Sequence, residues 1–287
     1  MTSSRVVRRV RFDFTAARSD QWAFPRAFLT LMLNGFTVLG PIVEPFLCRE
    51  MKAALPRIQD EELRRRARHL IAQEHTHERA HEDAWALFQR TGHSLDLLLR
   101  ATRWLVDDLV DRVVREVANP RLRGLLGLSA VAGAEHWIAT LTVTARHLFI
   151  PRWLNHPMVD LLAWHGMEEM EHRAVAFDVY RHLGGGEGLR RLGLLLSTVF
   201  FVLLTAMSMT WLLAQRPLRS LLLAPLILVD MLCFLFVVDW MAFRWTVALL
   251  RYLHPGFHPS RFSDQGFWAD FVSRRVEGVV PLDVHPT

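Results

Sequence analysis

Two stretches of the sequence each carry two glutamates and two histidines at relative positions 0, 3, 4 and 7. These positions form one stripe along an α-helix. The residues are Glu74, His77, Glu78 and His81 in the first stretch and, 91 residues later, His165, Glu168, Glu169 and His172 in the second. Imidazole mixed with carboxylate is the donor set of iron, manganese or zinc sites, and it does not suit calcium. The two stripes therefore predict metal-binding helices.

Two isolated glutamates precede these stripes and show the same 91-residue offset. Glu44 lies in the segment GPIVEPFL, and Glu135 lies in the apolar segment LLGLSAVAGAEHWIATLTV. A buried carboxylate without a partner costs several kcal/mol, so we expect Glu135 to have one. Each half of this pseudo-repeat thus consists of a helix with a lone glutamate followed by a helix with a Glu/His stripe.

This arrangement is the one needed for a di-metal site in a four-helix bundle. Two helices each supply one Glu, and the other two each supply Glu-x-x-His, all directed inward. Six residues fill these roles: Glu44, Glu74, His77, Glu135, Glu169 and His172. Glu78 with His81 is a rival first half-motif, because it keeps the 91-residue offset. His165 and Glu168 are further candidates, either as ligands or as partners of ligands. We expect two metal ions per chain, with iron favoured over manganese and zinc.

A second interpretation of the first stripe is a zinc protease site. His77-Glu78-x-x-His81 matches the HExxH pattern, in which both histidines bind one zinc ion. That interpretation requires a third ligand, and it leaves Glu44, Glu135 and the second stripe without a role. The bundle interpretation accounts for all of them, so we prefer it.

Helices account for almost the whole sequence, because apolar residues recur at spacings of three and four and Gly or Pro separates the segments. We therefore predict an all-α fold, a ferritin-like four-helix bundle followed by a hydrophobic helical hairpin. The predicted helices of the bundle cover 25–39, 41–54, 60–91, 94–118, 120–149 and 156–183.

Two apolar segments follow the bundle. Residues 192–214 carry no charge and would extend over roughly 34 Å as a helix, enough for a hydrocarbon core of about 30 Å. Residues 221–243 are apolar except for Asp230 and Asp239, and a mid-membrane acid argues against insertion. Two interpretations of these segments remain open: a membrane hairpin and a pair of buried helices. The predicted domains are 1–188 (bundle with metal site), 189–250 (hairpin) and 251–287 (tail).

Composition and charge narrow the classes of function. The 287 residues are 51% hydrophobic and carry a net charge of +5, without a Lys/Arg block interleaved with aromatic residues. Nucleic acid is therefore not an expected partner, whereas an anionic membrane surface is. Cys48 and Cys233 imply no disulfide framework, and the basic N-terminus is not followed by a signal-peptide core. We expect a cytoplasmic bundle attached to or inserted in the inner membrane through residues 192–243.

Two motifs resemble a bacterial family described as predicted metal-dependent hydrolases. They are Q-E-x-x-H-x-x-x-H from Gln73 to His81 and W-H-x-x-E-E-x-E-H from Trp164 to His172, followed by Ala176-Phe177-Asp178. The resemblance covers most of the chain up to about residue 250. More distantly, the Glu and Glu-x-x-His pairs look like the ferritin-like superfamily, which includes ribonucleotide reductase small subunits and acyl-carrier-protein desaturases. That likeness implies metal ligation by the six residues named above. The chain departs from the ferritin-like pattern in its two additional stripe histidines, His81 and His165.

Three functions are compatible with these observations. The favoured one is a di-iron oxidase or oxygenase that acts on a hydrophobic or lipid-like substrate near the membrane and needs an electron donor. A metal-dependent hydrolase, with a di-metal or an HExxH zinc site, is the second, and loss of ester hydrolysis in Glu135→Ala would favour it. A non-enzymatic metal-binding membrane protein is the third. A homo-oligomer is compatible with each of them.

Overall fold

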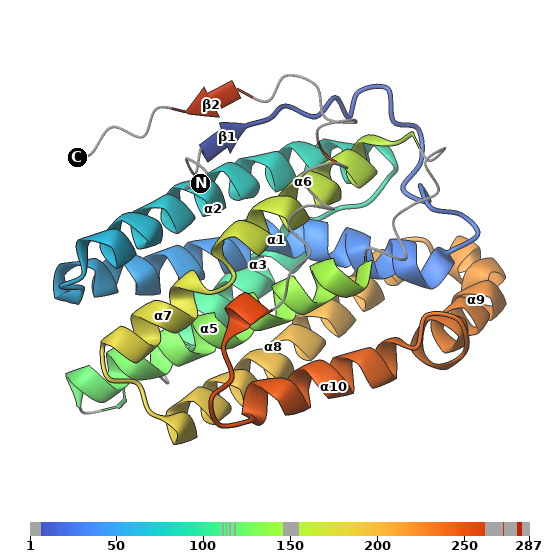
Figure 1. Cartoon of the computed structure of the whole chain (residues 1–287). Helices are drawn as coiled ribbons and strands as arrows, with labels where there is room; N and C mark the ends of the chain where they lie inside the picture. Colours follow the sequence, from blue (N-terminus) through green and yellow to red (C-terminus); the bar gives the residue numbers. More distant parts are fainter. Residues whose placement is uncertain are drawn as a thin grey trace.

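Helices make up nearly all of the described chain (Figure 1). The computed structural model describes residues 7–110, 112, 114, 116–117, 119–145, 155–261, 272 and 280–282. Besides the helices, strands β1 (Val7–Arg9) and β2 (Val280–Leu282) form a small antiparallel pair in which Arg8 lies opposite Pro281. The prediction of an all-α fold is confirmed.

The elements run in a simple order along the chain. The long α-helices are α1 (Ala27–Ala54), α2 (Glu61–Arg90), α5 (Pro120–Ala145), α6 (Pro157–His172), α8 (Glu187–Ala214), α9 (Pro217–Leu232) and α10 (Met241–Leu253). The shorter segments are η1 (Leu55–Arg57), α3 (Asp96–Arg103), η2 (Trp104–Val110), α7 (Val175–His182), η3 (Cys233–Val237) and η4 (Pro259–Arg261).

Local sequence signals set several of the helix ends. The Asp60 carboxylate accepts a hydrogen bond from the Leu63 backbone N–H at 3.0 Å and caps α2. His156 caps α6 in the same way by accepting from the Met158 backbone N–H at 3.2 Å. After α2, Gly92 has a φ of 88°, a left-handed conformation that glycine adopts at no steric cost.

Helices α1, α2, α5 and α6 form the bundle that carries the Glu/His stripes. Helix α1 packs along α2, and α6 packs against both α2 and α5. Helix α8 lies along the outer side of α5, where a Cβ on Gly193 would clash with the Ser129 backbone. In Figure 1, α8 and α10 lie below the bundle, and α9 lies at its right-hand end beside the start of α1. The bundle thus has one face toward β1 and another covered by α8.

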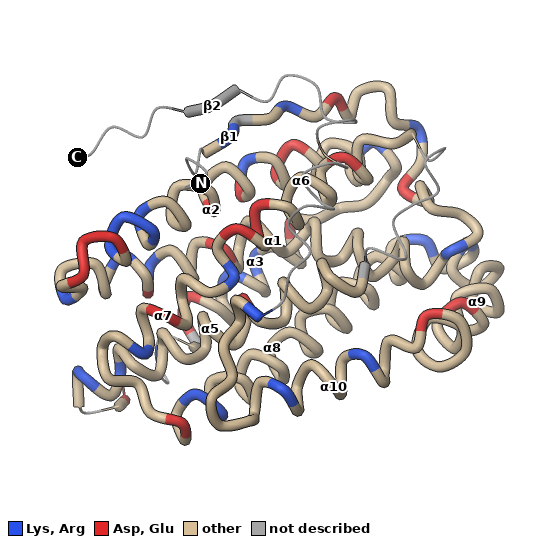
Figure 2. Tube along the Cα trace, in the orientation of Figure 1, with Lys and Arg blue, Asp and Glu red and all other residues tan. Residues whose placement is uncertain are grey.

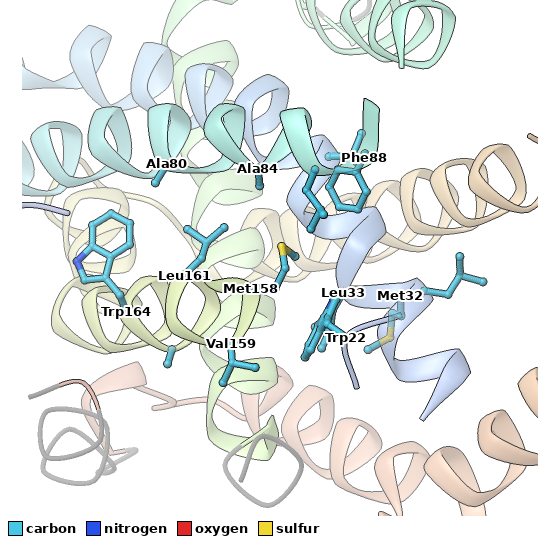
Figure 3. Close-up of a cluster of buried hydrophobic side chains, with 14 of the residues drawn as sticks. Trp22, Met32, Leu33, Ala80, Ala84, Phe88, Met158, Val159, Leu161 and Trp164 are labelled. Atoms are coloured by element: carbon cyan, nitrogen blue, oxygen red, sulfur yellow. The ribbon is translucent and has the colours of Figure 1, made fainter. Parts of the chain in front are cut away.

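The core between α2 and α6 combines small side chains with large ones (Figure 3). Ala80 and Ala84 of α2 are buried, and they face a part of α6 that presents Leu161 and Trp164. Each fully buried large apolar side chain contributes roughly 1.5–3 kcal/mol, so this packing holds the two stripe-bearing helices together. The close approach of α2 and α6 brings their Glu/His stripes within reach of one another.

Three predicted helix boundaries were wrong. The expected break at Gly40-Pro41 does not occur, because α1 continues through Pro41 and Pro45. Each Pro removes one backbone hydrogen bond, and the mostly buried packing of α1 outweighs that loss. The predicted helix 156–183 is divided at Arg173 and Ala174 into α6 and α7. The predicted helix 221–243 ends near Val237, and Trp240 has a positive φ of 54° before α10 begins.

Among the described residues, three helices are long and apolar enough to cross a membrane, and they span 27–57, 187–214 and 217–237. The first is mostly buried in the bundle, whereas the other two are largely exposed. Figure 2 shows long stretches without charge along α8 and α9, in contrast to α2. The domain boundaries 188/189 and 250/251 stay predictions, and most of the tail beyond residue 261 lies outside the described residues.

Asp230, whose charge was an argument against a membrane hairpin, has a clear structural role. Its carboxylate accepts a hydrogen bond from Arg26 Nε at 2.6 Å and from the backbone N–H groups of Phe28 and Leu29 at 2.9 and 3.1 Å. The carboxylate therefore caps the N-terminus of α1 and fixes α9 to the bundle. Its charge is compensated within the protein and would not face lipid.

Candidate metal centre

The bundle interior holds nine Glu and His side chains from four helices. Each helix gives residues on the side that faces the other three, so the stripes predicted from sequence meet there. The residues are Glu44 of α1; Glu74, His77 and His81 of α2; Glu135 of α5; and His165, Glu168, Glu169 and His172 of α6. All of them except His165 are buried, and the His165 side chain is 14% exposed.

Four of these residues form a first candidate ion site. Glu74, His77, Glu169 and His172 each offer one ligand atom, and these atoms lie within 4.8 Å of one another. His172 Nε2 lies 3.4 Å from Glu74 Oε1, and His77 Nδ1 lies 3.7 Å from Glu169 Oε1. These residues are the two Glu-x-x-His pairs predicted from the bundle pattern.

Glu135 adjoins this first group from α5. Its Oε2 atom lies 3.3 Å from Nδ1 of His172, the nitrogen on the other side of the ring from Glu74. A carboxylate in this position can either bind an ion directly or orient the imidazole that does. The lone glutamate of the apolar run therefore has the partner that its burial requires.

A second group lies closer to α1. Glu44, His81 and His165 each offer one ligand atom, and these atoms also lie within 4.8 Å of one another. His81 Nε2 and His165 Nδ1 are 2.6 Å apart. Gly40 leaves room for this group, because a Cβ there would lie 3.1 Å from Glu44 Oε1 and 3.4 Å from the His81 ring. The two histidines that depart from the ferritin-like pattern thus lie together with one of the isolated glutamates.

Glu169 connects the two groups. Its Oε1 atom lies 2.7 Å from His165 Nε2 in the second group and 3.7 Å from His77 Nδ1 in the first. A carboxylate has two oxygens and can accept from, or bind to, partners on both sides. In this position Glu169 would help to hold an ion in either group.

Many of the polar atoms in the two groups and in Glu135 form no hydrogen bond within the described part of the chain, although several of them lie at ion-pair distance from one another. These buried atoms are Glu44 Oε2, both carboxylate oxygens of Glu74 and of Glu135, His77 Nδ1, His81 Nδ1, Glu169 Oε2 and both ring nitrogens of His172. Leaving one such group unsatisfied costs about 1–3 kcal/mol, and more when it is charged. The donor atoms therefore fit bound metal ions, which would satisfy them together.

The charges of the metal-free chain partly compensate one another. Burial lowers the pKa of His77, but the carboxylates of Glu168 and Glu74 outweigh it and hold that pKa well above its usual value. Burial also lowers the pKa of His172, and the neighbouring Glu169 and Glu135 nevertheless raise it to about 10. Two imidazolium ions thus offset buried carboxylates where metal cations would otherwise do so.

The two histidines of the second group have lowered pKa values, in contrast to those of the first. Burial and the nearby His77 lower the pKa of His81 to about 3. Burial, His77 and His81 likewise keep the pKa of His165 well below its usual value. Both imidazoles are therefore neutral at physiological pH, and neutral imidazole is the form that binds metal.

Glu168 and Arg8 support the first group from outside. Glu168 Oε2 lies 3.1 Å from His77 Nε2, and Arg8 Nη1 donates to Glu168 Oε1 at 3.1 Å. Arg8 also donates to Glu171, which accepts a hydrogen bond from Gln73 Nε2 at 3.1 Å. Sequence reasoning included Glu168 but missed Arg8, because Arg8 comes from β1, 160 positions away from Glu168. The only sequence signal for Arg8 was the basic character of the N-terminus.

Glu78 does not join either group. Its side chain is 30% exposed and lies 3.5 Å from His75 at the surface of α2. His77 and His81 belong to different groups, so the geometry does not support an HExxH site, in which both would bind one ion. The same placement favours Glu74 with His77 as the first half-motif over Glu78 with His81.

The family of metal-dependent hydrolases predicted by resemblance is confirmed by a family model. A model described as "Predicted metal-dependent hydrolase" matches residues 6–262, which include every residue of both groups. The chain belongs to this family. No curated protein and no solved structure matches the chain. The ferritin-like relationship therefore stays a prediction.

Membership of this family corrects one prediction. The sequence argument favoured an oxidoreductase over a hydrolase, and that preference is wrong, because the family is described as one of predicted metal-dependent hydrolases. The error has a chemical reason: paired carboxylates and histidines hold two ions both in oxygen-activating enzymes and in hydrolases. The ligand pattern predicted metal dependence correctly, but it could not distinguish the two reaction types.

Proposed function

We propose that this chain is a di-metal hydrolase whose active site lies between α1, α2, α5 and α6. One ion would be held by Glu74, His77, Glu169 and His172, with Glu135 beside it, and the other by Glu44, His81 and His165. The observation that carries the proposal is the set of buried ligand atoms without hydrogen-bond partners among the described residues. Two divalent transition-metal ions would satisfy these atoms and offset the buried carboxylates.

Each part of the site has a role in this proposal. A metal pair supplies Lewis acidity toward the scissile group and makes water a nucleophile at neutral pH. Glu169 connects the two groups, since it contacts a histidine of each. Glu168, held by Arg8, fixes the orientation of the His77 ring. Trp164 packs edge-on against the same ring, with centroids 5.0 Å apart, and excludes water from that side.

Hydrolysis of generic substrates tests this proposal. The full-length protein is loaded separately with Zn²⁺, Mn²⁺ or Fe²⁺ and assayed with p-nitrophenyl acetate and bis(p-nitrophenyl) phosphate. We expect at least one metal form to be active and Glu135→Gln to lower kcat/KM by on the order of 100-fold. Glu82→Gln, at an exposed position of α2, is the matched control and should retain activity. Wild-type rates equal to those of Glu135→Gln for every metal would contradict the proposal and favour a non-enzymatic metal-binding protein.

We also propose that the protein is attached to the inner membrane through residues 192–243. Large apolar side chains are exposed on this segment, including Leu221 and Leu222, which are 71% and 72% exposed. Exposed apolar area of this extent is typical of membrane-binding or interaction surfaces.

Flotation with phosphatidylglycerol-containing vesicles tests membrane attachment. The wild-type chain should float with the vesicles, and the double variant Leu221→Glu/Leu222→Glu should bind at least tenfold more weakly. Equal flotation of both proteins, or none of either, would show that this surface does not bind lipid.

A further inference from the structure

A large cavity lies beside the metal groups, between α1, α5 and α8. Its volume is about 670 Å³, within the range of roughly 300–1,000 Å³ that holds small organic ligands. Apolar side chains form nearly all of its wall, among them Phe36 and Leu39 of α1 and Ile138 of α5. A cavity of this size and character fits a long hydrocarbon chain.

The cavity has one strongly polar part, and that part is the second metal group. Glu44, His81 and His165 all contribute to its wall. The described residues around the cavity include no Lys or Arg. The four buried carboxylates of Glu44, Glu74, Glu135 and Glu169 would offset the charge of two divalent ions, so an anionic ligand would find little net counter-charge there. The reacting group that reaches the metal groups from this cavity should therefore be neutral.

The cavity also extends to the apolar surface of the protein. Leu195, Leu196 and Val199 of α8 line it and are 59%, 44% and 49% exposed. These residues lie on one of the largely exposed helices that are long and apolar enough to cross a membrane. A hydrocarbon chain can therefore pass between lipid and the cavity without crossing a charged surface.

From these three observations we infer that the substrate is a neutral, long-chain carboxylic ester taken from the membrane through the α8 side of the cavity. The inference rests on the proposed hydrolase function and specifies its substrate class. Water adds to the acyl carbon, and the bond from that carbon to the ester oxygen breaks. The products are a long-chain carboxylic acid and an alcohol, whose oxygen takes up a proton from the water. The acyl chain occupies the apolar part of the cavity.

Chain-length dependence tests this inference. The wild-type protein is assayed with p-nitrophenyl esters of two to twelve acyl carbons, each below its micelle-forming concentration. Each buried methylene strengthens binding by about fourfold, so kcat/KM should rise at least 100-fold from acetate to decanoate. Ala134, a small residue in the cavity wall, is replaced by Phe to fill the space. Ala134→Phe should hydrolyse acetate within threefold of the wild type but lose at least tenfold on decanoate.

Two further variants make the test specific. Ala130→Phe fills a neighbouring part of the cavity wall and replaces Ala134→Phe if that variant does not fold. Ala206→Phe, at an exposed position of α8 outside the cavity wall, is the matched control and should behave like the wild type. Metal content is measured for each variant and should not change.

A binding measurement separates this inference from the proposed function. Dansyl-labelled hexadecyl ether, which cannot be hydrolysed, is titrated into the metal-free protein and followed by dansyl fluorescence. The wild type should bind it at least tenfold more tightly than Ala134→Phe. A chain-length profile that is flat, or a cavity variant that matches the wild type in both assays, would overturn the inference. Ether binding without hydrolysis of any ester would support the chain pocket and overturn the hydrolase proposal.

Discussion

Replacement of Glu169 by Gln is expected to remove both metal ions and lower kcat/KM by on the order of 100-fold or more. Glu169 Oε1 lies 2.7 Å from His165 Nε2 and 3.7 Å from His77 Nδ1, so one side chain serves both groups. The amide of Gln keeps the shape of the side chain but removes its negative charge and one acceptor oxygen. Metal content per chain and activity, measured on the same preparation, check this prediction.

Glu78→Gln is the control for this variant. Glu78 belongs to the same pseudo-repeat, but its half-exposed side chain lies outside both groups. The variant should keep both ions and its activity. Loss of metal in Glu78→Gln, with metal retained in Glu169→Gln, would mean that the two groups do not hold the ions.

Removal of metal is expected to destabilise the fold strongly. An ion at a free concentration of 1,000 times its Kd stabilises the native state by about 4.1 kcal/mol. One kcal/mol shifts the melting temperature by about 2–4 °C for a chain of 150–250 residues, so two ions, about 8 kcal/mol together, correspond to a loss on the order of 20 °C. The buried carboxylates, left without cations, are the physical cause. Thermal denaturation before and after exhaustive chelation measures the shift.

Glu135→Gln should have opposite effects on the melting temperature in the metal-loaded and metal-free proteins. In the metal-loaded state it loses contact with an ion or its histidine and should melt below the wild type. In the metal-free state it removes one buried carboxylate and should melt at the same temperature as the wild type or a few degrees above it. A wild-type melting temperature that chelation leaves unchanged would contradict this account of the interior.

The sequence was sufficient to predict the helical bundle and the residues that meet inside it. The 91-residue offset separates Glu44 from Glu135 and the first stripe from the second. It indicated that each half of the sequence supplies one helix with a lone glutamate and one helix with a Glu/His stripe to the same bundle. The apolar surroundings of Glu135 required a partner, and His172 is that partner. These conclusions depend on local periodicity and burial, which sequence reveals directly.

The division into two groups could not be predicted in the same way. His77 and His81 are one helical turn apart on the same face of α2, yet they contribute to different groups. The assignment depends on how α1, α2 and α6 cross, and side-chain periodicity does not determine crossing geometry. The contact between Arg8 and Glu168 is likewise invisible in sequence, since it joins residues 160 positions apart.

Local sequence signals also gave the wrong result at two places in the helices. The break after His172 falls at Arg173 and Ala174, which are neither Gly nor Pro, whereas the expected break at Gly40-Pro41 is absent. In both places tertiary contacts decide the outcome: Arg173 Nε donates to the Pro259 carbonyl at 3.2 Å, and α1 is packed between neighbours. Local propensity predicts neither result.

The metal content of freshly purified wild-type protein, measured by elemental mass spectrometry, tests the central claim most directly. Two buried ligand groups joined by Glu169 predict about two divalent transition-metal ions per chain. The number should fall below one in Glu169→Gln. A single zinc ion in the wild type, or no bound metal after loading with zinc, manganese or iron, would contradict the di-metal site.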